Sequence, residues 1–278
     1  MASVSARVLP GFRLSLGYTL IYLMILVLIP LAACFAKASS LSFRQFLAAI
    51  WTERARAAYA LSFGASLAAA GVNVILGLLV AWVLARYDFP FRRLFDALVD
   101  LPFALPTAVA GLVYSSLYVP NGWLGRFLCP MGIDAAYSRL AAVLVLVFTG
   151  FPFVVRTVQP VLVTLDIELE EAAAILGANR LQTFRRVILP PLVPALMTGF
   201  ALALARALGE YGSVVFVSGN MPYKTEIAPV LIVARLEAFN YGEAAAIAVV
   251  LLSMSFALLA AVNVLERWSR DAAGTVTS

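Results

Sequence analysis

Apolar runs separated by short polar segments follow one another along the whole chain. Each run has room for about 20 helical residues, which is what crossing a hydrocarbon core about 30 Å thick requires. Lipid offers no partner to an open sheet edge, and no run alternates strictly between apolar and polar positions as a membrane barrel strand does. The pattern therefore predicts an all-α membrane protein with six transmembrane helices in a single domain, 1–278. The expected spans are 14–35, 61–85, 97–119, 138–155, 194–217 and 243–265.

The composition agrees with a chain whose main solvent is lipid. Hydrophobic residues make up 63% of it and charged residues 13%, with a mean hydropathy of +0.96. The net charge of +5 is spread over the loops, so it indicates membrane topology and contact with lipid headgroups, not binding to a nucleic acid. Cys34 and Cys129 form no CxxC motif and the chain has no histidine, so no metal site is expected.

The first apolar run has two interpretations. Residues 31–34, Leu-Ala-Ala-Cys, match the cleavage pattern of a bacterial lipoprotein signal. The run over 14–33 is longer than the ~7–15 residues of a signal-peptide core, however, which favours an uncleaved span. When both termini are placed in the cytoplasm, the segments on that side carry slightly more Lys and Arg than the others, as is usual for multi-pass membrane proteins.

The segment between the fourth and fifth spans, 156–190, is polar and is expected in the cytoplasm. Acidic residues cluster where a helix would begin, close to the positive end of its dipole; they are Asp166, Glu168, Glu170 and Glu171. Gly177 permits a tight turn, and a second amphipathic helix is expected over 179–189, ended by Pro190 at the start of the next span. The pattern predicts a helical hairpin, which either binds a partner or rests on the membrane surface.

The hairpin also carries a spaced motif, E-A-A-x3-G-x9-[IV]-x-L-P. This motif resembles the signature of the permease subunits of binding-protein-dependent ABC importers, with Val187 where isoleucine is commoner, a volume-conserving difference. The resemblance implies a type I ABC importer permease fold in which the hairpin couples to a separate ATPase subunit. The residues that it assigns to coupling are Glu171, Ala172, Ala173, Gly177, Val187, Leu189 and Pro190.

The chain contains no G-x-x-x-x-G-K-[ST] phosphate-binding loop. We therefore expect a non-catalytic subunit without a cofactor of its own. The resemblance implies that ATP-Mg is used by two partner ATPase subunits, whose closure would pull the hairpins together and move the spans from inward-open to outward-open.

The third expected span begins with an unusual stretch, D-L-P-F-A-L-P-T-A-V-A-G-L, from position 100. Pro102 and Pro106 lie four residues apart and lack amide hydrogens, so the helix should kink there. Lipid tolerates such a kink only where protein or a watery cavity supplies new partners. The kink either shapes packing or lines a translocation pathway, to which Thr107, Ser115 and Ser116 would contribute hydroxyl groups.

The fifth expected span contains R-A-L-G-E-Y-G, which places Arg206 and Glu210 four positions apart on one helix face. A charge inside the membrane costs ~2.5–3.5 kcal/mol on insertion scales, so both side chains should face the bundle interior and pair. The pair is either structural or part of a gate or pathway.

These two stretches are similar to the T-type membrane subunit of bacterial sulfate/thiosulfate importers. Molybdate permeases share the R-A-L-G-E-[FY]-G piece, whereas the proline-rich stretch favours sulfate. The resemblance implies a bacterial inner-membrane complex of this chain, a second related permease subunit, two ATPase subunits and a periplasmic sulfate-binding protein. The outer segment 218–241 is a candidate docking surface for that binding protein.

Two other classes remain as alternatives. A molybdate or other oxyanion permease would share most of these features. A proton-coupled anion transporter usually needs several buried acids or histidines, and only Glu210 lies clearly inside a span. An intramembrane serine protease or lipid phosphatase would need a histidine, which the chain lacks.

Overall fold

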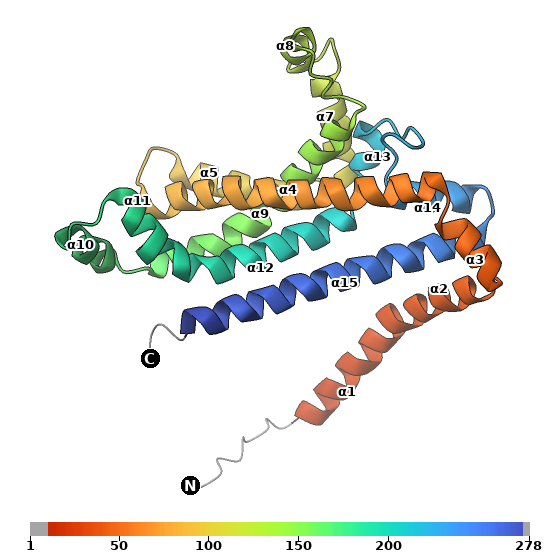
Figure 1. Cartoon of the computed structure of the whole chain (residues 1–278), viewed down its shortest axis with the longest axis horizontal. Coiled ribbons are helices and arrows are strands. Elements are labelled where there is room, and N and C mark those ends of the chain that lie inside the picture. The colour runs from red at the N-terminus through yellow and green to blue at the C-terminus, as the bar shows by residue number, and fades with distance from the viewer. Residues whose placement is uncertain (1–10, 275–278) are drawn as a thin grey trace.

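The computed structural model describes residues 11–274, and every regular element in that part of the chain is a helix (Figure 1). The prediction of an all-α protein is therefore confirmed. Residues 1–10 and 275–278 lie outside the described residues, and with them Arg7, one of the basic residues on the side expected to be cytoplasmic.

Three long helices lie side by side and form the core: α4 (Glu53–Arg86), α9 (Arg139–Thr164) and α12 (Leu189–Leu208). Small residues allow them to approach closely, as is usual for helices in lipid. A Cβ atom on Gly77 of α4 would lie 2.7 Å from Cβ of Val154 on α9, and one on Gly199 of α12 would lie 2.9 Å from Cα of Val154. The three backbones thus meet around one point of α9.

Two further long helices flank this core. The helix α15 (Tyr241–Gly274) packs against α12 and against α14 (Ala228–Glu237). The N-terminal helix consists of α1 (Phe12–Leu23), a π-turn η1 (Met24–Leu28) and α2 (Ile29–Ser39). Only its α2 part lies against α15, while α1 leans away from the other helices (Figure 1). Its apolar side chains are therefore left for lipid or for another chain.

Within the described residues, five helices are long and apolar enough to cross a membrane: Leu14–Ser39, Glu53–Arg86, Arg139–Thr164, Arg180–Leu208 and Tyr241–Glu266. They overlap the first, second, fourth, fifth and sixth expected spans. The fifth differs at its end, because the helix stops at Leu208 and the expected residues up to 217 form a loop and the short α13 (Val214–Val217).

The expected third span, 97–119, is not one helix, and here the prediction of a simple kink is wrong. The segment forms α5 (Arg92–Val99), α6 (Leu101–Ala104) and α7 (Thr107–Tyr118). Leu105 and Pro106 are extended, with ψ of 129° and 133°, because a residue before proline is forced out of the helical region and Pro106 has no amide to donate. The chain changes direction there, and α7 carries α8 (Gly125–Leu128) and η2 (Cys129–Met131) away from the bundle (Figure 1).

The remaining helices mark the two ends of the bundle (Figure 1). One end holds α10 (Ile167–Ile175), α11 (Arg180–Thr183) and the π-turn η3 (Phe184–Ile188), which together form the hairpin. The other end holds α3 (Phe43–Ile50) and α14. We call these the hairpin end and the α14 end.

Candidate coupling hairpin and translocation segments

The first arm of the hairpin is α10, which ends in a turn that requires glycine. Gly177 has a φ of +81°, its N–H donates to the carbonyl of Ala174, and the N–H of Ala178 donates to the carbonyl of Ala173, each at 3.0 Å. This pair of bonds closes the helix as a Schellman motif. A Cβ atom on Gly177 would meet no atom within 4 Å, so the backbone conformation, not lack of space, demands glycine.

The second arm begins at Asn179 and continues directly into the membrane helix. The side chains of Asn179 and Gln182 cap the helix start reciprocally, at 2.9 and 2.8 Å. The prediction that Pro190 ends this arm is wrong, since α11, η3 and α12 form one run over Arg180–Leu208. In η3 the N–H of Leu189 donates to the carbonyl of Phe184, and this wider turn relieves the clash between a proline ring and the preceding turn.

The residues that the motif assigns to coupling are spread over both arms. Glu171, Ala172, Gly177 and Pro190 are exposed, while Ala173, Val187 and Leu189 are half-buried. A shallow cavity of about 380 Å³ lies between the arms; its lining includes Ala173, Leu176, Gly177, Gln182, Arg186 and Val187. The fold thus brings Ala173, Gly177 and Val187 to one surface and leaves the others around it.

The most exposed apolar residues of the hairpin are two that the motif does not specify. Ile175 and Leu176 are 86% and 87% exposed at its tip. Large apolar side chains so exposed at the end of a polar hairpin are typical of a contact surface. Their position directly before the turn glycine is a sequence signal for this surface that the motif does not include.

The predicted ion pair in the fifth span is present. Arg206 donates from Nη1 to Glu210 Oε2, and Glu210 is only 2% exposed. Its other carboxylate oxygen accepts from the N–H and the hydroxyl of Ser213, at 2.9 and 2.8 Å. Glu210 lies just beyond the end of α12 and not within the helix, so its charge fixes the start of the following loop as well as pairing with Arg206.

That loop and α13 pack along α7. The hydroxyl of Ser115 donates to the carbonyl of Phe216 at 2.7 Å, and a Cβ atom on Gly111 would lie 2.9 Å from Cα of Ser213. A Cβ atom on Gly212 would clash with the hydroxyl of Thr107. The fold therefore brings Thr107 next to the loop that Glu210 holds.

The other predicted pathway residues are placed differently. Pro106 is the residue that starts α7, directly before Thr107, whereas Pro102 lies on α6. The neighbouring Phe103 packs edge-to-face on Phe153 of α9, with ring centroids 5.1 Å apart, so α6 is held by α9. Ser116 donates to the carbonyl of Val113 within α7 and takes no part in the contact with the loop.

A charge network near the hairpin end was not predicted from the sequence. Arg156 on α9 donates to both carboxylate oxygens of Asp100, at 2.9 and 2.7 Å. It also donates to Asp96 Oδ1 and to the Asp96 carbonyl, each at 2.7 Å, and to Gln159 at 2.8 Å. All five guanidinium N–H groups are thereby engaged. The pKa of Asp96 lies below its usual value, mainly because its carboxylate accepts a hydrogen bond from Arg156.

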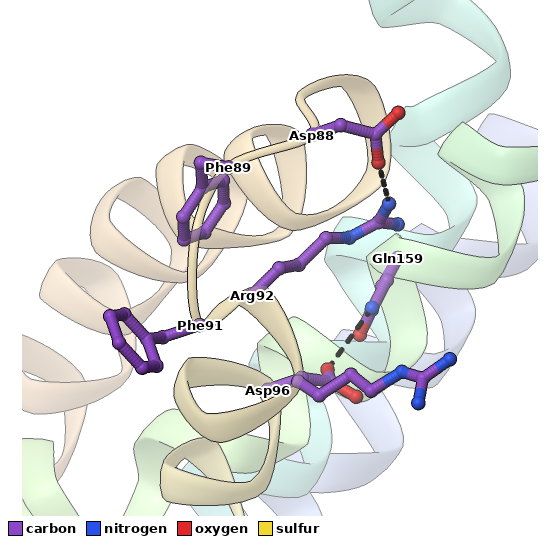
Figure 2. Close-up of a pocket in the computed structure, with 7 residues that line it drawn as sticks. Asp88, Phe89, Phe91, Arg92, Asp96 and Gln159 are labelled. Atoms are coloured by element: carbon purple, nitrogen blue, oxygen red, sulfur yellow. Dashed lines mark hydrogen bonds and ion pairs between the residues drawn. The ribbon is translucent and has the colours of Figure 1, made fainter.

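Figure 2 shows the open cavity beside this network, about 560 Å³ in volume, where the chain turns from α4 into α5. Arg92 pairs with Asp88 at 2.6 Å, and Gln159 donates to Asp96 at 3.2 Å. The bond from Gln159 holds α5 to α9, whereas the pair of Arg92 with the exposed Asp88 stays local to the turn. Phe91 has a φ of +63° and points away from them at the start of α5 (Figure 2).

At the α14 end, the loop over 218–227 is tied to the core helices. Glu226 is almost fully buried and accepts two bonds from Arg54 of α4, at 2.7 and 2.6 Å. Arg139 of α9 donates to the carbonyl of Lys224 at 2.8 Å. The loop itself leaves Met221 and Tyr223 exposed, so a rigidly held apolar and basic surface faces outward.

Comparison with known proteins places these features in a family. The family described as "Binding-protein-dependent transport system inner membrane component" matches residues 73–271. The chain is 48% identical over 275 residues to the sulfate transport system permease protein CysT of Salmonella typhimurium, covering 99% of each chain. It is 51% identical over 252 residues to the protein of the same name from Synechocystis, covering 91% of this chain and 88% of the relative.

Solved structures show the same fold at low identity. One is a bacterial ABC transporter that imports the acidic polysaccharide alginate, with a TM-score of 0.72 at 17% identity, covering 92% of this chain and 94% of the other. Another is the alginate transporter in complex with a periplasmic protein bound to an alginate pentasaccharide, with a TM-score of 0.75 at 19% identity, covering 92% and 93%. The predicted fold of an ABC importer permease is thus confirmed. The chain belongs to the family of binding-protein-dependent transport system inner membrane components and, within it, to the sulfate transport system permease proteins.

Proposed function

We propose that this chain is the permease subunit of an ATP-driven importer that carries sulfate and thiosulfate across the bacterial inner membrane. The observation that carries the proposal is the hairpin between α9 and α12, whose exposed Ile175 and Leu176 stand at its tip beside the turn at Gly177. A surface of this kind needs a protein partner. The choice of sulfate as the substrate is supported by the relatives that are named sulfate transport system permease proteins.

The partner of the hairpin is a separate ATPase subunit, which binds and hydrolyses ATP-Mg. In this arrangement the hairpin end is cytoplasmic, as are both termini, and the α14 end is periplasmic. A second related permease subunit, two ATPase subunits and a periplasmic sulfate-binding protein complete the complex. The loop with Met221, Tyr223 and Lys224 is a docking surface for the binding protein, since Arg54 and Arg139 hold it rigidly.

The translocation pathway runs past the contact between α7 and the loop after α12. Thr107 and Arg206 contribute polar groups there; Arg206 is about one-third exposed although its partner Glu210 is buried. Pro106 shapes the pathway by starting α7 at this point, and Pro102 supports it from α6. A dianion needs such polar or hydrated surroundings to cross the bilayer.

Growth of a strain that lacks this subunit tests the substrate. The strain should fail to grow on sulfate as sole sulfur source and should grow normally on cysteine, and a plasmid copy of the gene should restore growth on sulfate. A defect confined to molybdate-dependent growth would contradict the assignment and favour the oxyanion alternative.

A further inference from the structure

Both arms of the hairpin contact one face of α4. Glu170 on the first arm accepts from Arg86 at 2.7 Å, and Phe184 on the second arm packs edge-to-face on Trp82, with ring centroids 6.0 Å apart and planes at 65°. Trp82 and Arg86 are four residues apart in the last turns of α4, so they lie on the same side of the helix. We call these two residues the seat.

The pair between Arg86 and Glu170 joins two helix ends of opposite polarity. Arg86 is in the last turn of α4, where the helix dipole favours a cation, and Glu170 is in the first turn of α10, where the dipole favours an anion. The two side chains are 15% and 27% exposed. The guanidinium of Arg86 also lies 5.9 Å from the ring centroid of Trp82, so the two residues of the seat support each other.

These contacts hold the base of the hairpin and leave its tip free. Ile175 and Leu176 point into the surroundings, whereas Glu170 and Phe184 are fixed to α4. A displacement applied at the tip therefore reaches α4 through the seat, in addition to reaching α12 through the continuous second arm. From α4 it passes to α9 and α12, because the close approach around Gly77 and Val154 leaves no space for independent movement.

We propose that Trp82 and Arg86 are positioning residues for coupling, through which movement of the hairpin is transmitted into the transmembrane core. The inference rests on the proposed function, in which an ATPase subunit moves the hairpin. Coupling free energies between two sites in a protein typically correspond to about 5- to 150-fold changes in binding affinity.

The test uses the full complex in proteoliposomes, with sulfate uptake and ATP hydrolysis measured together and the copurifying ATPase quantified. Glu170→Gln, Arg86→Gln and the double variant remove the ion pair, and Trp82→Leu removes the ring contact. Glu170→Gln keeps shape at a partly exposed site and should fold. Arg92→Gln is the matched control, because it removes a pair at the same end whose partner Asp88 is 95% exposed.

We expect the variants at Glu170, Arg86 and Trp82 to retain their ATPase subunits. Each should lower sulfate uptake per ATP hydrolysed by about fivefold or more. The double variant should be no worse than either single one, and Arg92→Gln should match the wild type. Unchanged uptake per ATP in Glu170→Gln and Arg86→Gln would overturn the inference. So would loss of the ATPase from these variants, because the seat would then act on docking and not on transmission. If the wild-type chain copurifies with no ATPase, the proposed function itself fails.

Discussion

At the scale of single residues, the buried carboxylates of Glu210 and Glu226 are each paired with an arginine. Glu210 is buried, but Arg206 and Ser213 use both of its carboxylate oxygens. Arg54 does the same for Glu226 at the α14 end. A buried carboxylate costs several kcal/mol unless it is paired in this way. The Arg206–Glu210 pair could be predicted from its i,i+4 spacing, whereas the Arg54–Glu226 pair could not, because 172 residues separate its members.

Single and double substitutions at Arg206 and Glu210 show whether the two residues act as a structural pair or have independent roles in transport. If the pair is mainly structural, Arg206→Ala and Glu210→Ala should each reduce sulfate uptake more than the double variant does, since each single change leaves one charge without its partner. Uptake in membrane vesicles at equal protein levels measures this. Losses that simply add in the double variant would show separate roles in the pathway.

A substitution at Gly177 tests whether the turn of the hairpin contacts the ATPase subunit. Gly177→Asp adds a charged side chain there, and the space around it is open, so the chain should still insert while sulfate-stimulated ATP hydrolysis is abolished. The αL backbone disfavours a side chain by about 1–2 kcal/mol, less for aspartate than for most residues. Insertion is checked by the protein level in membranes, and full ATP hydrolysis in the variant would reject the role of the turn.

At the scale of elements, hydropathy located the long helices but not the interruption between α6 and α7. The apolar run over 97–119 continues through Leu105 and Pro106, so an average over the window does not detect two extended residues. The side-chain network of Arg156 was also outside the reach of the sequence, since Asp96 and Asp100 come from a different element. That network fixes α5 against α9.

Arg156→Lys tests how much that network contributes. Lysine keeps the charge but not the planar fork that bonds Asp96 and Asp100 together. We expect a loss of about 1–2 kcal/mol in stability, moderated by the partial exposure of all three side chains. Thermal unfolding in detergent measures it, with Arg92→Lys as the control at an exposed pair. A variant as stable as the wild type would show that the bidentate bonds of Arg156 do not contribute to the stability of the folded chain.

At the scale of the whole molecule, the surface is arranged for lipid and for other chains. The most apolar part of the N-terminal helix is entirely unburied, and α7 with α8 leaves the bundle. Neither feature stabilises an isolated subunit in water. The hairpin and the α14 end lie at opposite ends of the long helices (Figure 1), so one chain presents separate surfaces to the two sides of a membrane.

If the hairpin tip touches an ATPase subunit in the cytoplasm, a cysteine at position 176 should crosslink to that subunit. In a chain with Cys34→Ala and Cys129→Ala, one variant carries Leu176→Cys, and a matched variant carries Phe43→Cys at a side chain that is 77% exposed on α3 at the other end. Only the Leu176→Cys variant should crosslink to a copurifying ATPase, and its thiol should be protected from impermeant reagents in intact cells. Labelling of position 176 from the periplasm, or crosslinking from position 43 but not from position 176, would show that the hairpin does not contact a cytoplasmic ATPase.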